Sequence, residues 1–529
     1  MSDRQMLVRL SKAVKTEMEA GPPGDAAWDA TQFLTGQPQA ILPLIDLIFD
    51  EGNKDRSDDG LVSAYLYLFG FGLETVRQKS EARQREADAL LDSVRVAVAE
   101  RGERPETDPG TMLLVLSRFI GARLDPGDGL RDLMAGMAGE MDGFGDVPGL
   151  DGGDPASFLD DLLAMSDGDP FILFEQVRQM ALTLPEDHRI ELGQVLFHAD
   201  APVVREAALG WFLDPAPAVR DAAAAAVADG PVVSGVTLRR MIALRSWLPE
   251  PARAPLDRAI QASRRRGVDC APWPKGDLRE AHATFIDGAG AQTLILVSAS
   301  KRRSVLGNVL LKDGVGVCEV FSRPGMTKAE TRHFLAMVGS VMDLMPVTPA
   351  FVEEVLRHSL AVGVDQGMPP PFGLLDLLET AGLPPPTPAW KTATALLDAL
   401  PAAAGEAPWA STVYDDWIIA ESWFENGDDV TSLLKAAGKR PNRARLAALV
   451  LESGLPPHRE EWADRLAWVA ATLHSSTDKG RKAQGVALAG IVRGVADPAV
   501  PLDSIPLMQH IAAQTVEAFL ADKALKGRG

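Results

Sequence analysis

The sequence contains few of the residues that cross-link or ligate a small fold. Its 529 residues include only two cysteines, Cys270 and Cys318, and aromatic residues make up 6% of the chain. Two cysteines cannot form a disulfide framework, and no Cys or His pair has the spacing of zinc ligands. We therefore expect no metal site and a reducing compartment.

Long uncharged apolar runs are also missing. The longest, residues 61–73, is shorter than the ~20 residues that a membrane-spanning helix needs. The first 20 residues mix acidic and basic side chains with scattered apolar ones, so they lack the apolar core of a signal peptide. These absences predict a soluble, cytoplasmic protein without a membrane partner.

The residues that are abundant favour helices. Hydrophobic residues are 46% and charged residues 24% of the chain, which is ordinary globular usage. Alanine, leucine, glutamate and arginine fill most segments, and the length predicts several packed units. We divide the chain into an N-terminal helical domain (1–139), an acidic glycine-rich linker (140–170), a segment of helical repeats (171–270), a basic β module (271–330) and a C-terminal helical domain with proline-rich connectors (331–529).

One local repeat stands out between residues 200 and 230. Pro202-Val-Val-Arg-Glu-Ala-Ala and Pro217-Ala-Val-Arg-Asp-Ala-Ala recur at an offset of 15, and each begins a helical pattern with one apolar stripe. The pattern resembles the HEAT-type repeat, whose units often carry an Asp-Pro turn, a Val-Arg pair and an alanine-rich helix. The resemblance covers about residues 187–260. It implies stacked helical hairpins and a protein-binding surface that includes Arg205 and Arg220.

Between residues 282 and 323 the spacing of apolar residues changes from a helical pattern to one typical of extended strands. The strand candidates are residues 283–288, 293–297, 305–311 and 315–321. Asp287-Gly288 and Asp313-Gly314 are turn signals, so we predict an antiparallel meander of three or four strands with a helix on one face. The expected fold class is mainly α: an irregular HEAT-like helical hairpin array with a small antiparallel β meander.

Helical patterns resume after residue 327. Residues 443–453, 460–474 and 479–495 are predicted to form further helical hairpins. Six of the ten tryptophans lie between residues 390 and 468, and we predict that most of them belong to the core.

Charge is distributed unevenly along the chain. The net charge is −20, which opposes nonspecific binding to nucleic acid, but residues 253–332 contain 14 Lys or Arg against 8 Asp or Glu. The run 264–266 precedes Gly267 and can stabilise a helix C-terminus, and the run 301–303 suits a solvated hairpin turn. Together with Lys275, Arg279, Lys312, Arg323 and Arg332, the two runs can instead form one positive face for phosphates.

Eight residues are the resulting candidates for a binding surface. They are Arg264, Arg265, Arg266, Lys301, Arg302, Arg303, Arg205 and Arg220.

The sequence contains no phosphate loop, nucleophile elbow, zincin helix or dinucleotide fingerprint. Two Ser-x-x-Lys matches, at 432–435 and 476–479, lack the partner motifs of serine–lysine enzymes. We therefore predict no cofactor and a noncatalytic helical-repeat scaffold that binds a protein partner. Two alternatives stay open: nucleic-acid binding through residues 253–332, and an enzyme whose site is assembled from distant residues.

Overall fold

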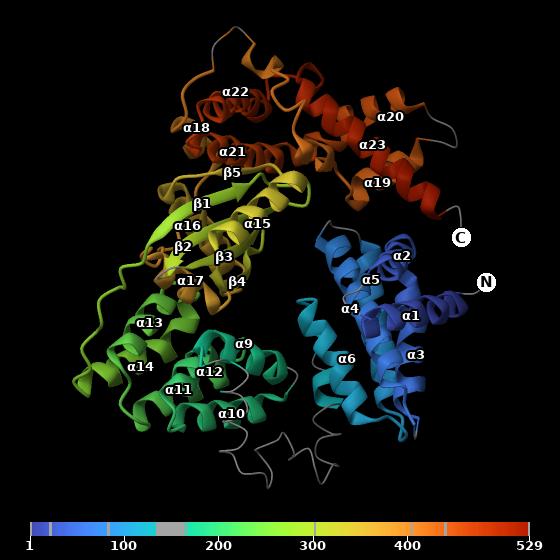
Figure 1. The fold of residues 1–529 in the computed structure, drawn as a ribbon. Helices are drawn as coiled ribbons and strands as arrows, with labels where there is room; N and C mark the ends of the chain where they lie inside the picture. Colours follow the sequence, from blue (N-terminus) through green and yellow to red (C-terminus); the bar gives the residue numbers. More distant parts are fainter. Residues whose placement is uncertain are drawn as a thin grey trace. The chain divides into compact units, whose positions relative to one another are not determined.

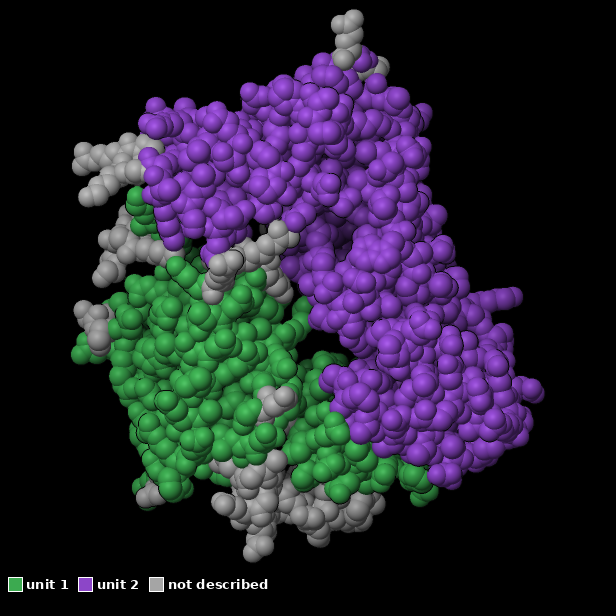
Figure 2. Space-filling view, turned by 180° about the vertical axis from the view of Figure 1, so that it is seen from behind, with its two compact units in different colours: residues 1–208, 521–529 green, residues 209–520 purple. Residues whose placement is uncertain are grey.

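The chain forms two compact units. The computed structural model describes residues 3–20, 24–54, 56–81, 85–127, 129–133, 163, 166, 168–182, 184–300, 303–403, 405, 407–437 and 442–526. Unit 1 comprises residues 1–208 and 521–529, and unit 2 comprises residues 209–520 (Figure 2). The boundary falls inside the predicted repeat segment. Most of the predicted acidic linker (140–162, 164–165 and 167) lies outside the described residues.

Among the described helices of unit 1, five pack around a central one and three others pack on one another (Figure 1). Its helices are α1 (Asp3–Ala20), α2 (Asp25–Gly36), α3 (Ile41–Gly52), α4 (Asp59–Glu81), α5 (Arg85–Gly102), α6 (Pro109–Gly121), α9 (Pro170–Ala181), α10 (Glu186–His198) and α11 (Pro202–Ala207). α4 contacts α1, α2, α3, α5 and α6 and contains the apolar run 61–73. In its core the rings of Phe69 and Phe119 meet edge to face at 5.9 Å. No described helix is long and apolar enough to cross a membrane.

The two repeat copies form helices at the predicted places. The first is α11 followed by a short 3-10 turn (Ala208–Leu213), and the second is α12 (Pro217–Asp229). The residues that form the apolar stripe of each helix are buried in both copies. The exception is Ala222 of the second copy, which is half-buried. The burial of one side of each helix follows from the apolar spacing. The resemblance to HEAT repeats remains a prediction.

Unit 2 combines helices with one sheet (Figure 1). After α12 its helices are α13 (Gly235–Arg245), α14 (Arg253–Arg265), α15 (Lys328–Val341), α16 (Pro349–Asp365), α17 (Gly373–Ala381), α18 (Ala393–Asp398), α19 (Asp428–Ala436), α20 (Arg443–Leu449), α21 (Arg459–Ser475), α22 (Lys479–Ala496) and α23 (Pro506–Lys526, whose last residues belong to unit 1). The predicted C-terminal helical segments thus form, and α21 packs along α22.

The sheet is an antiparallel meander with one added strand. Its strands are β1 (Leu278–Thr284), β2 (Ala291–Ser300), β3 (Arg303–Lys312), β4 (Gly316–Met326) and β5 (Leu344–Pro346), in the order β4-β3-β2-β1-β5. The predicted strands 293–297, 305–311 and 315–321 are confirmed in β2, β3 and β4, whereas the first prediction, 283–288, was wrong for all but two residues because β1 ends at Thr284 and the turn begins after it. β5 was not expected. The Asp313-Gly314 turn forms between β3 and β4, with Gly314 at a φ of +70°, a backbone region that favours glycine. The fold class is therefore mainly α with a small β meander.

Helices cover both faces of this sheet. On one face, Leu377 of α17 lies so close to Gly307 of β3 that a β-carbon there would collide with it, and α16 also contacts β4. On the other face, α15 packs through Phe334, Leu335 and Val338 against a small core cluster. The members of that cluster are Ile295, Leu306 and Met326. The expected covering helix is present, and a second layer lies opposite.

Candidate functional site

The run Arg264–Arg266 ends α14, as the glycine after it predicted. All three side chains are exposed, and Arg266 donates to the carbonyl oxygens of Val227 and Ala228, each at 3.3 Å, at the end of α12. Cations at these helix ends are stabilising because the carbonyl groups carry the negative end of the helix dipole. This geometry explains Arg266 without a ligand and leaves Arg264 and Arg265 in solvent.

Arg205 and Arg220 have matching roles in the two repeat copies. Arg205 donates to Asp200 O at 2.7 Å, and Arg220 donates to Pro215 O at 2.8 Å. Each guanidinium also reaches the carbonyl oxygen one residue earlier, so it closes the turn that precedes its own helix. These bonds give both arginines a structural role.

Only the last residue of the second basic run, Arg303, lies among the described residues. Lys301 and Arg302 lie outside the described residues. Arg303 begins β3 and donates to Gly325 O at 3.2 Å. Arg323 lies on the neighbouring strand β4, where it pairs with Leu306 of β3. α14 packs on α12 and α13, whereas β3 pairs with β2 and β4, so the two basic runs belong to separate neighbourhoods.

The remaining basic candidates divide between several places. Lys312 ends β3 at the opposite end of the sheet from Arg303, and Arg279 pairs with Asp277. Arg332 lies on the exposed side of α15 and donates to the carbonyl oxygen of Lys328, one turn earlier, at 3.3 Å. The structure therefore brings Arg303 and Arg323 together near Glu330 of α15, and not all of the predicted positive face.

α15 is poorly packed for a helix of its length. A capping box between Thr327 and Glu330 begins it, which explains why a helix starts here. Of residues 328–340 only Thr331 is buried, whereas α16 buries nine of its 17 residues. Because an amphipathic helix is normally held by its buried stripe, α15 has an unusually open flank.

Large apolar side chains are exposed beside this helix. Phe321 is 48% exposed, Met337 52% and Met342 42%. Phe321 pairs with Asn308, which pairs with Ile295, and residues directly opposite in a sheet share a face. Since Ile295 packs under α15, Phe321 lies on the face that α15 covers only in part.

The charge of Glu330 on α15 interacts with those of Arg303 and Arg323. Met337 lies on the same side of α15 as Glu330, whereas Lys328 and Arg332 lie on the opposite side. We define the α15 surface as Arg303, Phe321, Arg323, Glu330 and Met337.

Sequence reasoning found part of this surface. Arg303 and Arg323 were among the proposed cations, whereas Met337 was not singled out. The sequence did contain a signal for it. All five residues of 334–338 are apolar, and five consecutive helical residues point in all directions, so a single covering sheet face cannot bury them all.

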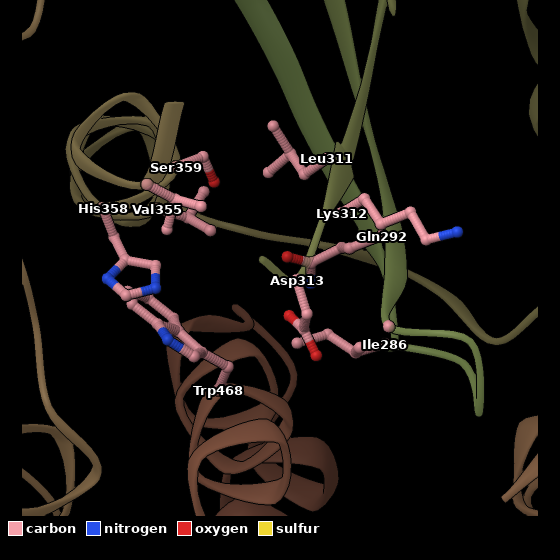
Figure 3. A pocket seen from close by; sticks show the side chains of 11 residues that line it. Ile286, Gln292, Leu311, Lys312, Asp313, Val355, His358, Ser359 and Trp468 are labelled. Atoms are coloured by element: carbon pink, nitrogen blue, oxygen red, sulfur yellow. The ribbon is translucent and has the colours of Figure 1, made fainter. Parts of the chain in front are cut away.

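A small pocket lies at the other end of the sheet, between the strand turns, α16 and α21 (Figure 3). Its free volume is about 30 Å³, which holds about two water molecules. Gln292 donates to Thr284 O at 2.8 Å and to Thr472 Oγ1 at 3.2 Å. Gln292 thus ties β1 and β2 to α21.

Arg465 of α21 forms the main ionic contact beside the pocket. Its Nε donates to Asp313 Oδ2 and its Nη1 to Gly288 O, both at 3.0 Å, while its guanidinium lies 4.9 Å from the Trp462 ring centre. The Asp313 side chain is 41% exposed. Within the described residues, no group of three or more potential ligands could hold a metal ion.

His358 lines the pocket as a neutral base. Its Nδ1 accepts the Lys391 backbone N–H at 3.2 Å, and its ring lies 4.8 Å from that of Trp468 and 5.3 Å from that of Trp390 (Figure 3). Burial lowers the pKa of His358 to about 4. The side chain is therefore uncharged at neutral pH and packs as an aromatic group.

This pKa predicts an acid sensitivity of unit 2. The unfolded chain binds a proton at His358 near pH 6.5 and the folded chain only near pH 4, so protonation favours unfolding. The free energy of unfolding should fall by up to about 1.4 kcal/mol per pH unit between these values. Denaturant titrations at several pH values should show a flatter profile for His358→Gln. Parallel profiles for the two proteins would contradict this.

The architecture defines a mainly helical protein with one five-stranded antiparallel sheet, and sequence comparisons place it near one other protein. Residues 185–267 match the Y4lR second domain, and residues 398–520 match the Y4lR C-terminal helical domain. The chain is 25% identical over 482 residues to "Uncharacterized protein y4lR" of Sinorhizobium fredii (strain NBRC 101917 / NGR234), covering 85% of this chain and 88% of that one. No solved structure matches.

The two family matches leave a gap that contains the candidate surface. Residues 268–397 fall between them and include all five strands and α15. The side chains of the α15 surface therefore lie outside both matched domains.

Proposed function

We propose that the protein is a noncatalytic helical scaffold that binds a protein partner through the α15 surface. The observation that carries the proposal is the exposure of Phe321 and Met337 beside α15, in which only Thr331 is buried among residues 328–340. Exposed apolar side chains grouped on one face are typical of protein-binding sites. Aromatic and methionine side chains are enriched at such sites because they bury a large area with few rotors.

The pocket near His358 supports the enzyme alternative less well. Gln292 and Asp313, two of the polar side chains that line it, are engaged in bonds to α21. A catalytic site needs room for a substrate beside its acid or base. The α15 surface, by contrast, is already open.

The proposal predicts that truncating two exposed side chains of the α15 surface weakens the binding of the partner. We expect the double variant Phe321→Ala/Met337→Ala to bind its partner about 30-fold more weakly, since a hot-spot pair contributes 2 kcal/mol or more. Quantitative affinity purification from a native lysate, read by mass spectrometry, measures this. Both side chains are exposed, so the melting temperature should stay unchanged.

Two other exposed apolar residues of unit 2 provide the control. Val232 is 57% exposed and Met368 49%, and neither lies on α15 or β4. The variant Val232→Ala/Met368→Ala should retain every protein that the native chain retains. The proposal fails if both double variants retain the same set of proteins as the native chain.

A further inference from the structure

We infer that the protein partner of the α15 surface is a second copy of the chain, and that the two copies pair β4 with β4 in antiparallel orientation about Phe321. The inference rests on the proposed function and goes further by naming the partner. It follows from the open edge of the sheet and from the order of the charged residues along β4.

β4 is an edge strand. The order β4-β3-β2-β1-β5 leaves one side of β4 without a paired strand in the described part of the chain. At such an edge, alternate residues direct their backbone N–H and C=O groups away from the sheet, where another extended chain can bind them. None of residues 318–325 is buried, whereas the inner strand β2 buries six of its ten residues. The edge is therefore open over most of β4.

The helices beside the sheet leave this stretch accessible. α15 contacts β3 and β5, while Phe321 of β4 is 48% exposed. On the opposite face α16 and α17 contact β4, and α16 lies closest at the start of the strand, where a β-carbon at Gly316 would collide with Ser359 O. Gly316 and Val317 are accordingly buried, and the open stretch begins after them.

The exposed residues of β4 have an order that is complementary to itself. Glu319, Phe321 and Arg323 are two residues apart, so they project on one face, the face of α15. In an antiparallel pair centred on Phe321, Glu319 of each copy lies opposite Arg323 of the other. The two Phe321 rings then lie opposite each other. Opposite charges and paired aromatic rings in such cross-strand positions stabilise a sheet, so the sequence of β4 favours a second β4 as its neighbour.

The charges around β4 also favour a second copy over a polyanion. The face carries two cations and two carboxylates: Arg303, Arg323, Glu319 and Glu330. Glu330 accepts the Thr327 backbone N–H at 2.6 Å, and this bond, with the nearby charges of Arg323 and Arg303, holds its pKa below the usual value. Nucleic acid binds best to surfaces of net positive charge. A face with two charges of each sign is better matched by a copy of itself.

Pro324 limits the length of the pairing. It has no backbone N–H, so a ladder centred on Phe321 ends at residue 323 of each copy. Pairing over residues 319–323 gives a small interface, and small interfaces are typical of weak complexes. We therefore expect a dimer that forms and dissociates with protein concentration.

Sedimentation of the full-length chain at several concentrations tests the pairing. The native chain should dimerise reversibly. Glu319→Arg puts arginine opposite arginine at both ends of the pair, and Arg323→Glu puts glutamate opposite glutamate. Each variant should therefore weaken the dimer at least about tenfold. An equal mixture of the two variants should form dimers within about threefold of the native affinity, because each arginine then faces a glutamate.

The charge control is Arg264→Glu, which changes the net charge as Arg323→Glu does but lies on α14, a helix that packs on α12 and α13. It should leave the dimer affinity within about twofold, since distant exposed charges are screened. Glu319 and Arg323 are exposed, so the melting temperatures of their variants should match that of the native chain.

Three results would overturn the inference: a native chain that stays monomeric, a dimer that neither charge variant weakens, and a mixture of variants that associates no better than its components. The first of these is distinct from a failure of the proposed function. If the native chain is monomeric and a lysate protein is still lost with Phe321→Ala/Met337→Ala, the α15 surface binds a different protein, and the proposed function stands without this inference.

Discussion

Replacing Glu379 by alanine is expected to destabilise unit 2 by about 3–5 kcal/mol. Glu379 of α17 accepts from Arg239 at 2.7 Å and from Arg240 at 2.8 and 3.1 Å, both on α13. The side chains are 9–11% exposed. Although burial alone would raise the pKa of Glu379, hydrogen bonds from Arg240 and Arg239 hold it below its usual value. Removing the carboxylate takes away the negative charge that the two nearly buried guanidinium groups share.

Tryptophan fluorescence during denaturant unfolding measures this loss in the full-length chain. Nine of the ten tryptophans lie in residues 209–520, so the signal reports on unit 2. Glu353 of α16 is exposed, and Glu353→Ala should change the free energy of unfolding by less than about 0.5 kcal/mol. A Glu379→Ala protein as stable as this control would mean that the ion pairs between α13 and α17 contribute no stability.

Replacing Trp423 by alanine is expected to lower the free energy of unfolding of unit 2 by about 3–5 kcal/mol. The Trp423 side chain is fully buried, its Nε1 donates to Ile286 O at 2.9 Å, and its ring meets that of Trp417 edge to face at 6.1 Å. The neighbouring Ser422 hydroxyl accepts the Gly288 N–H at 3.0 Å. These contacts fasten the segment before α19 to the turn between β1 and β2, so truncation opens a cavity and breaks a buried bond.

The exposed Trp390 is the comparison for this variant. Its side chain is 60% exposed, and its ring contacts the His358 ring in an edge-to-face arrangement. Trp390→Ala should cost about 1 kcal/mol or less. A Trp423→Ala protein that unfolds in two separate tryptophan-detected steps would show instead that the sheet and the C-terminal helices are independent.

The β meander was predictable because its signals are local. Asp287-Gly288 and Asp313-Gly314 mark turns by their tolerance of unusual backbone angles, and the apolar runs between them fit strands. β5 could not be found in this way. It has three residues, Leu344–Pro346, and it exists only because β1 offers an edge for pairing 60 residues earlier in the chain. Short strands of this kind depend on tertiary contacts.

The tryptophans illustrate how far residue type predicts burial. Trp417, Trp423, Trp462 and Trp468 belong to the core as predicted, because a large apolar ring is costly to leave in water. Trp390 does not, although its sequence surroundings give no sign of the difference. Its exposure depends on the course of the loop after α17, which the sequence alone does not determine.

The candidate surface was only partly predictable because it is assembled from separate elements. The sequence showed the excess of cations between residues 253 and 332, but it could not separate Arg264–Arg266, which end α14, from Arg303 and Arg323, which lie beside α15. Arg205 and Arg220 resembled a binding pair and instead close their own turns. The sequence shows where the charged side chains are, but not which backbone carbonyl oxygens accept their hydrogen bonds.

Photo-crosslinking from α15 tests the central claim most directly. A benzophenone amino acid replaces Met337 in one protein and the equally exposed Val232 in another, and both are illuminated in native lysate. The account predicts a discrete crosslinked protein from position 337, absent from position 232 and lost when Phe321→Ala is added. The same products from both positions, or none from position 337, would contradict a protein-binding role for this surface.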